Sequence, residues 1–239
     1  MNLRARPFPS LASVIPAALT GLLLASAAAA APPVERLEDL LQRVRQRQAG
    51  IQSLRAEFVE KRSGPLLAEP VTVRGRFEFL APDRLRWESA APDPMVLVIA
   101  GQELTAWYVD LGRAQRVRLG RQGRLLSRYF AAGATLDELL EYFDVDWRAP
   151  ASPGEAHRLR LVPRYPRIAR RLAELTLWID PDTDLPVRFS FRDGGGAVTD
   201  LRFLELEVDP ALPADRFVLE LPSDVMVEEA EQTDAIALP

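Results

Sequence analysis

The segment from residue 71 to residue 109 constrains the fold of this chain more than any other part. It contains, in order and joined by short turns, VTVRGRFEFL, DRLRWES, MVLVIA and ELTAWYV. In the first of these, apolar side chains alternate with Thr, Arg and Glu, which is the two-residue period of a half-buried strand. Consecutive strands joined by short turns predict an antiparallel sheet with a large apolar face.

Strands of the same kind are predicted on both sides of this segment. Residues 95–100 are almost uniformly apolar, so we expect both faces of that strand to be covered. Asp193-Gly194-Gly195-Gly196 predicts a hairpin turn. The complete set of predicted strands covers residues 54–62, 71–79, 84–88, 95–100, 103–109, 114–120, 156–162, 172–179, 186–192, 198–208 and 217–221.

Helical spacing of apolar residues replaces the two-residue period in three places. Residues 34–49 predict an amphipathic helix. Two shorter helices are predicted at residues 122–131 and 136–143, the second with Thr135 as its N-cap. The solvated face of this last helix is expected to carry the carboxylates of Asp137, Glu138, Glu141, Asp144 and Asp146 rather than an acid–base pair.

The order of these elements indicates the fold class. One helix is followed by six strands, a helical insertion and four or five more strands, without the strand–helix alternation of a parallel sheet. We therefore expect an α+β fold with a single curled antiparallel sheet of about 10–11 strands, which forms an incomplete or half barrel. The N-terminal helix and the short lid helices are expected to cover its concave apolar face.

Residues 1–31 have the pattern of a secretory signal peptide. Arg4 and Arg6 precede an apolar stretch that ends in a run of alanines. A membrane anchor is the alternative interpretation, but Pro16 interrupts the stretch, which is shorter than the roughly 20 residues that span a bilayer. We expect cleavage at residues 29–31.

The remaining residues, 32–239, are expected to form one domain with a frayed tail after about residue 228. The formal net charge is -4 and both signs alternate along the chain, so neither a nucleic-acid footprint nor a polybasic membrane patch is predicted. The chain contains no cysteine, so it cannot form disulfides or carry a lipid on an N-terminal Cys. We expect a soluble protein of the Gram-negative periplasm that is stabilised by its packed core.

Patterns typical of catalysis and metal binding are weak. His157 is the only histidine, and no Ser, Cys or Asp stands at a triad spacing around it. Asp180, Asp182 and Asp184 resemble the start of a calcium loop, but Phe191 occupies the position of the bidentate glutamate. This stretch is better explained as a turn. We predict a protein that is not an enzyme and needs no metal or cofactor.

The most distinctive chemistry is a surplus of large apolar side chains on the predicted strands. They could form an ordinary core or the wall of a lipid-binding cavity, and strand alternation alone does not say which face is concave. The candidate cavity-wall residues are Phe58, Phe77, Phe79, Leu85, Trp87, Trp107, Leu175, Leu177, Phe189 and Phe191.

Several motifs stand in an order that is typical of one known family. They are LRAEFVEKR, GRFEFL, APDRLRWESAAPDPMVLVIAGQELTAWYVD, LTLWIDPDTDLPVRFSFRDGGGAVTDLRF and LPADRFVLELPSDVMV. Together they resemble the LolA family of periplasmic outer-membrane lipoprotein carriers over nearly all of residues 34–228. The resemblance implies an incomplete barrel, lidded by helices, whose cavity holds the acyl chains of a lipoprotein. It also implies that Leu85 and Trp87 lie on the cavity wall.

The resemblance further implies the partners of the chain. The cargo would be an acylated lipoprotein or related lipid, received from an ABC-type exporter in the inner membrane and passed to an acceptor in the outer membrane. Contact with membranes would be transient, no nucleic acid would bind, and the protein would be a monomer. Three alternatives stay open. One is a lipid-sensing or protein-interaction domain of the same fold, of the type that regulates anti-sigma factors, and another is a carrier of a glycolipid or free acyl cargo for another exporter. The third is an enzyme of lipid metabolism that depends on His157.

One position departs from the family pattern. The first members of the family have an arginine immediately before the proline of the APDRLRW motif, and that arginine is associated with cargo release. This chain has Ala81 there. Arg76, Arg84 or Arg86 are candidates for the same role.

Overall fold

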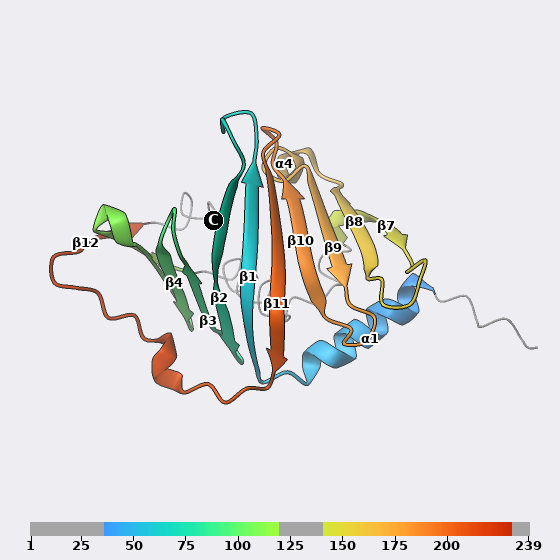
Figure 1. Cartoon of the computed structure of the whole chain (residues 1–239), viewed down its shortest axis with the longest axis horizontal. Helices are drawn as coiled ribbons and strands as arrows, with labels where there is room; N and C mark the ends of the chain where they lie inside the picture. Colours follow the sequence, from blue (N-terminus) through green and yellow to red (C-terminus); the bar gives the residue numbers. More distant parts are fainter. Residues whose placement is uncertain (1–35, 120–140, 231–239) are drawn as a thin grey trace, which may run out of the picture. The chain divides into compact units, whose positions relative to one another are not determined.

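A computed structural model describes residues 36–119 and 141–230 of the chain. All of them belong to one compact unit, which spans residues 35–239. Its centre is a 12-stranded sheet with the order β12-β6-β5-β4-β3-β2-β1-β11-β10-β9-β8-β7 (Figure 1). Neighbouring strands run antiparallel except β12, which runs parallel to β6. The predicted α+β class and curled antiparallel sheet are confirmed, with twelve strands instead of the expected ten or eleven.

The bounds of the elements agree closely with the sequence period for most of the chain. The strands are β1 Ser53–Ser63, β2 Val71–Leu80, β3 Arg84–Ser89, β4 Met95–Ala100, β5 Glu103–Tyr108, β6 Arg113–Arg118, β7 Phe143–Arg148, β8 His157–Pro163, β9 Glu174–Ile179, β10 Pro186–Arg192, β11 Val198–Val208 and β12 Met226–Ala230. The helices are α1 Leu37–Ala49, α4 Pro166–Ala169 and the 3₁₀ turns η1 Val109–Leu111 and η2 Ala214–Phe217. No helix in these described ranges has the length and apolar character needed to cross a bilayer.

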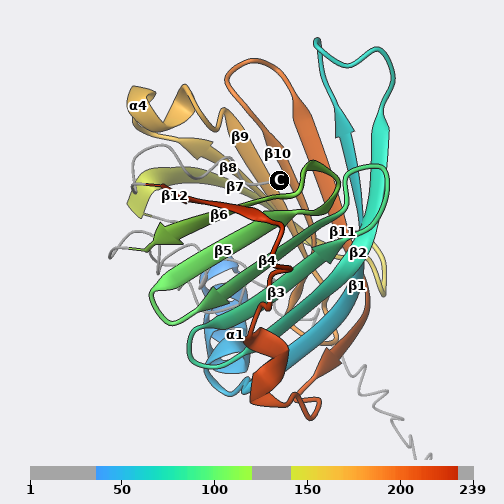
Figure 2. The ribbon, with the colours of Figure 1, turned by 90° about the vertical axis from the view of Figure 1, so that its left-hand side faces the viewer.

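Two antiparallel meanders make up the sheet. Strands β1 to β6 form the first, and β7 to β11 form the second. The two are joined where β1 pairs with β11, so that strands from opposite ends of the chain lie at the centre of the sheet. A twisted sheet with this many strands cannot stay flat, and Figure 2 shows it curling.

Helix α1 covers one part of the sheet. Leu40, Leu41 and Val44 lie on one side of it and are buried against β7, β8 and β9. Arg43 reaches the turn between β9 and β10, where its Nε donates to Asp184 at 3.0 Å. The amphipathic helix expected from residue 34 is confirmed from Leu37 onward.

The turn between β9 and β10 confirms the interpretation of the aspartate run. Asp180 Oδ1 accepts hydrogen bonds from the backbone N–H and the hydroxyl of Thr183, both at 2.9 Å. Asp193 likewise closes the predicted hairpin turn, accepting from the N–H of Gly195 at 2.8 Å. Aspartate side chains that bond to their own turn in this way are a common turn signature.

Three expectations about the secondary structure were wrong. Residues 143–148 form strand β7, so Asp144 and Asp146 lie on a strand and not on a helix. Residues 214–217 form η2, and no strand follows at 217–221. Strand β12 was missed, and it extends to Ala230.

In two of these cases a short segment gains its structure by pairing with a neighbouring strand rather than from its own pattern. β7 pairs with β8, and β12 pairs with β6. The expected signal peptide, the helix at 122–131, most of the helix at 136–143 and the end of the tail lie outside the described residues.

Candidate lipid-binding face

The strand register places the large apolar side chains on one face of the sheet. Residues directly opposite each other on paired strands project to the same side. Phe77 is opposite Ala56 on β1 and opposite Trp87 on β3. Phe79 is opposite Leu85, by the same register. This face is the one that α1 covers further along the sheet, and we call it the inner face.

The inner face continues across the second meander. Phe58 is opposite Phe203 on β11, while Leu201 on the same strand is opposite Phe189 on β10. Phe189 in turn is opposite Leu177 on β9. The structure therefore brings nine of the ten candidate residues to one face: Phe58, Phe77, Phe79, Leu85, Trp87, Leu175, Leu177, Phe189 and Phe191.

Trp107 is not brought together with the others. It is opposite Val96 on β4 and Ala114 on β6, whereas the inner face of β4 carries Met95 and Leu97. Trp107 therefore lies on the opposite, outer face. The segment ELTAWYV has large side chains at both parities, so the sequence did not indicate which of them belongs to the set.

Aromatic rings form a continuous row across the middle of the inner face. The rings of Phe58 and Trp87 stack with centroids 3.9 Å apart. Phe77 contacts Phe203 at 5.2 Å, and Phe203 meets Phe189 edge-on at 5.8 Å. We call these five residues the aromatic row. Phe203 was not among the sequence candidates, although it follows Leu201 at the two-residue spacing of an inward-facing position.

Gly75 makes the stacking within this row possible. A Cβ atom at this position would lie 2.3 Å from Phe58 Cζ and 2.0 Å from the backbone oxygen of Glu88. Both distances are far below van der Waals contact. The absence of a side chain at Gly75 therefore leaves the space that the Phe58 ring occupies beside Trp87.

On β1 the inner face carries charged side chains toward one end of the strand. Glu60 follows Phe58 on the inner side of β1, is 2% exposed and forms an ion pair with Arg62. Arg62 also lies 3.7 Å from Asp93 in the loop between β3 and β4. A buried carboxylate is stable only with a charged or hydrogen-bonding partner, which Arg62 supplies. The inner side of β1 is thus amphipathic along its length.

His157 also lies on the inner face, where it is opposite Ile179 and buried. Its ring lies 6.2 Å from that of Trp147 and nearly parallel to it. The imidazole of His157 thus lies beside an indole ring.

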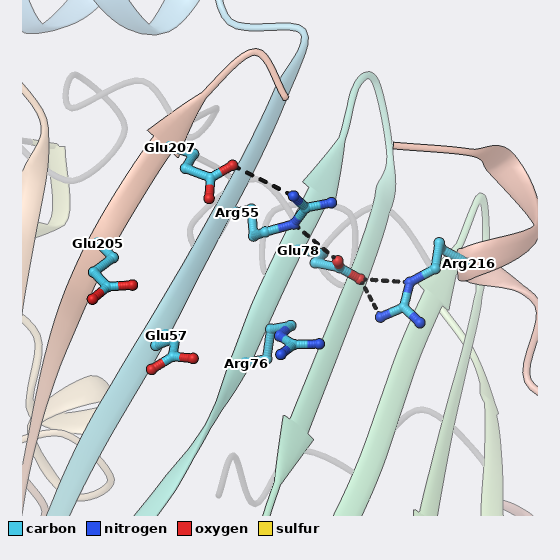
Figure 3. Close-up of a pocket in the computed structure, with 7 residues that line it drawn as sticks. All are labelled: Arg55, Glu57, Arg76, Glu78, Glu205, Glu207 and Arg216. Carbon is cyan, nitrogen blue, oxygen red and sulfur yellow. Dashed lines mark hydrogen bonds and ion pairs between the residues drawn. The ribbon is translucent and has the colours of Figure 1, made fainter. Parts of the chain in front are cut away.

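The outer face carries a polar pocket of about 360 Å³ over β1, β2 and β11 (Figure 3). At its centre Glu78, 3% exposed, accepts from Arg55 Nε at 3.3 Å and from Arg216 Nη2 at 2.8 Å. The Glu78 carboxylate raises the pKa of the Arg216 guanidinium above its ordinary value. These charge-assisted bonds attach η2 to the sheet. The other residues that line the pocket are Glu57, Arg76, Glu205 and Glu207.

The arginines suggested as replacements for a release arginine lie on this outer face. Arg86 is opposite Glu78, and Arg76 is opposite Glu57. Arg84 is opposite Leu80 and lies two residues before Arg86 on β3, so its side chain points to the same outer face. Since side chains of the outer face point away from the apolar side, these three arginines do not reach the aromatic row. Ala81 packs at the edge of the apolar cluster.

The fold defines the class of this protein: an incomplete antiparallel barrel with an apolar inner face. A protein from Thermus thermophilus, described as an uncharacterized conserved protein, has a similar structure, with a TM-score of 0.53 at 15% identity. The similarity covers 81% of this chain and 98% of that one. At this identity, the likeness concerns the fold alone.

The family follows from the sequence comparisons. Residues 49–220 match the family model described as outer membrane lipoprotein carrier protein LolA. A protein from Alkalilimnicola ehrlichii named outer-membrane lipoprotein carrier protein is 31% identical over 187 residues, which is 75% of this chain and 79% of that protein. One of the same name from Halorhodospira halophila is 28% identical over 226 residues, 91% and 96% of the two chains. The chain belongs to the LolA family, and the resemblance expected from its motifs is confirmed.

Proposed function

We propose that this protein is a periplasmic carrier that sequesters the acyl chains of a lipoprotein and moves it from the inner to the outer membrane. The observation that carries the proposal is the aromatic row, which gathers apolar side chains from five neighbouring strands on one face of a curved sheet. Family membership and the names of the relatives support it. The protein acts by binding and release and not by catalysis.

The physical need for a carrier lies in the acyl chains. Each methylene group that leaves water contributes about 0.8 kcal/mol, so a lipidated protein does not cross an aqueous compartment unshielded at a useful rate. Phe58, Phe77 and Trp87 are themselves buried. An acyl chain therefore reaches them only when the packing over them opens, which makes binding and release conformational steps.

The positions of apolar and charged side chains on the inner face suit one orientation of the bound lipid. The aromatic row suits acyl chains, whereas the ion pair of Glu60 and Arg62 suits a polar group at their end. In the proposed complex the acyl chains lie along the aromatic row, and the polar head of the lipid lies toward Arg62. The inward-facing candidates of β1, β2, β3 and β10 line this path, whereas Leu175 and Leu177 lie on β9, in the part of the sheet that packs against α1. Trp107 is outside the path.

The partners follow from the same role. The donor would be an ABC-type exporter of the inner membrane and the acceptor a protein of the outer membrane, with the carrier working as a monomer between them. Export to the periplasm would involve cleavage of the signal peptide at residues 29–31.

Quenching by brominated acyl chains tests the proposed site directly, because bromine quenches only indole rings that it nearly touches. We expect a brominated fatty acid to quench the fluorescence of the wild type and to lose most of that effect on Trp87→Phe. The matched control is Trp107→Phe, on the outer face of a nearby strand, which should leave quenching unchanged. Equal quenching in both variants would remove the aromatic row as the binding site.

Native mass spectrometry of the protein recovered from a periplasm tests the cargo class. The expected result is a co-purified lipid-modified polypeptide in the wild type and in Trp107→Phe. A glycolipid or free fatty acid in its place would keep the binding face but reject a lipoprotein as cargo. Protein that carries no lipid under any condition, together with absent quenching, would reject the carrier role.

A further inference from the structure

The loop between β8 and β9 is strongly basic. Residues 163–173, PRYPRIARRLA, contain four arginines and no acidic residue, although the whole chain has a net charge of -4. One of the four, Arg164, forms an ion pair with Asp144 at 2.8 Å. The other three, Arg167, Arg170 and Arg171, are exposed, and in the described part of the chain no ion pair holds them.

A second loop packs directly beside this one, and a third loop packs against the second. Gly194, in the hairpin between β10 and β11, is so near the Arg170 backbone that a Cβ atom would lie 2.1 Å from the Arg170 carbonyl oxygen. A Cβ atom at Gly64, in the loop between β1 and β2, would lie 2.9 Å from Ala197 in the same hairpin. Figures 1 and 2 both show the three loops at one end of the sheet. We call them together the basic rim: residues 64–67, 163–173 and 192–197.

Large apolar side chains project from the same rim. Leu66 is 98% exposed, and Tyr165 is 51% exposed. The ring of Tyr165 lies 6.1 Å from that of Tyr142, which is also exposed. A leucine fully in water, and exposed aromatic rings on another loop at the same end of the sheet, are typical marks of an interaction surface. The arginines of residues 164–171 restrict the kind of partner that fits this end of the sheet.

We propose that the basic rim docks onto the surface of a bilayer that contains anionic phospholipid. Arginines attract the lipid phosphates, and exposed leucine and tyrosine side chains enter the region between headgroups and acyl chains. Glu60 and Arg62 lie at this end of β1, so docking brings this ion pair of the inner face next to the membrane. The proposal goes beyond the carrier role, because docking does not depend on which cargo the inner face binds.

Vesicle sedimentation with the purified protein tests the contribution of the arginines. We expect binding to vesicles of phosphatidylethanolamine with phosphatidylglycerol, but not to pure phosphatidylcholine, and weaker binding as salt is raised. The triple variant Arg167→Gln, Arg170→Gln and Arg171→Gln should partition at least about tenfold less. Its matched control changes three exposed arginines at the opposite end of the strands: Arg47→Gln, Arg118→Gln and Arg148→Gln.

A fluorescent label tests insertion of the apolar tip. Because the chain has no cysteine, Leu66→Cys offers a unique site for an environment-sensitive dye. We expect its emission to shift to the blue on anionic vesicles, while a dye at Ala151→Cys, in the loop between β7 and β8, does not respond. Cargo retention, measured in parallel, should be unchanged in the triple arginine variant, which separates a failure of docking from a failure of the carrier proposal.

Two results would overturn membrane docking. One is equal loss of vesicle binding in the rim variant and in its control, which would indicate a general effect of charge. The other is absence of binding to anionic vesicles by the wild type. Rim-dependent binding to a purified membrane protein in detergent, without binding to vesicles, would assign the surface to a protein partner instead.

Discussion

The two halves of the inner face are covered in different ways. Over β7, β8 and β9 the apolar side chains pack against α1, whose Leu40 is completely buried. Over β3, β2, β1, β11 and β10 they pack against one another as the aromatic row, with Phe58 stacked on Trp87. Phe189 contacts both clusters and lies at the boundary.

From this difference we infer that the two halves of the inner face have different roles. A helix joined directly to β1 and tied to the sheet through Arg43 and Asp184 provides a permanent core. Stacked rings provide an apolar surface whose broad faces suit other flat or flexible apolar groups. We therefore expect substitutions under α1 to change stability alone, and substitutions in the aromatic row to change lipid binding as well.

The largest effect is expected from Leu40→Ala under α1. Removing a fully buried leucine side chain should lower the free energy of unfolding by about 2–5 kcal/mol. Denaturant titration measures this, with Gln42→Ala on the exposed side of the same helix as control. Bromine quenching of the folded fraction should equal that of the wild type. A selective loss of quenching would show that the two halves are not separate.

Gly75→Ala should have the next largest effect, and a different one. The new methyl group meets a backbone oxygen and the Phe58 ring, and such overpacking costs about 1–3 kcal/mol. Because the ring must leave its place beside Trp87, quenching by brominated acyl chains should also change. The control Gly50→Ala adds the same methyl group at the end of α1, where its nearest neighbour lies 3.8 Å away. This control should change neither the free energy of unfolding nor the quenching. Unaltered quenching in Gly75→Ala would argue that the stack does not contribute to binding.

Arg43→Gln tests the polar tie between α1 and the sheet. Its pair with Asp184 is partly exposed, so the loss should be no more than about 1 kcal/mol. Thermal unfolding at low and high salt measures it, and the difference between variant and wild type should shrink as salt is added. A larger, salt-independent loss would mean that Arg43 acts mainly through packing.

The smallest effect is expected from Asp209→Asn, which should change how the stability of the protein depends on pH. Asp209 accepts hydrogen bonds from the backbone N–H groups of Gln52 and Ser53, which lower the pKa of its carboxyl group. A carboxyl group whose pKa is lower in the folded state contributes stability above its unfolded pKa, and that stability is lost as the pH falls through the folded value. Asp209→Asn should therefore flatten the fall in the denaturation midpoint between about pH 5 and pH 3. An identical slope in variant and wild type would assign the acid sensitivity to other groups.

Much of the fold could be predicted from local patterns. The alternation in residues 71–80 fixed both the strand and its apolar side, and residues 186–192 behaved in the same way. Strands β7 and β12 could not be predicted, because each is short and gains its structure by pairing with a neighbour. Residues 214–217 form a helical turn whose Arg216 is held by Glu78 on the outer face, a contact between distant parts of the chain.

The sequence predicted the apolar character of the candidate site but not all of its residues. Large side chains on alternating strands were sufficient to find nine of the inward-facing residues. Trp107 was included because its strand has large residues at both parities, and Phe203 was left out although it completes the aromatic row. The arginines of residues 164–171 were visible in the sequence, but their place at the same end of the sheet as residues 64–67 and 192–197 depends on the fold.

By itself the sequence determined the strand periods, most of the turns and the family of this protein, since these depend on neighbouring residues and on the order of short motifs. Only the tertiary structure decided that β1 pairs with β11, because register between distant strands is set by the packing of the whole sheet. That pairing places Phe58 opposite Phe203, unites the two meanders in one apolar face and collects three distant loops into the basic rim.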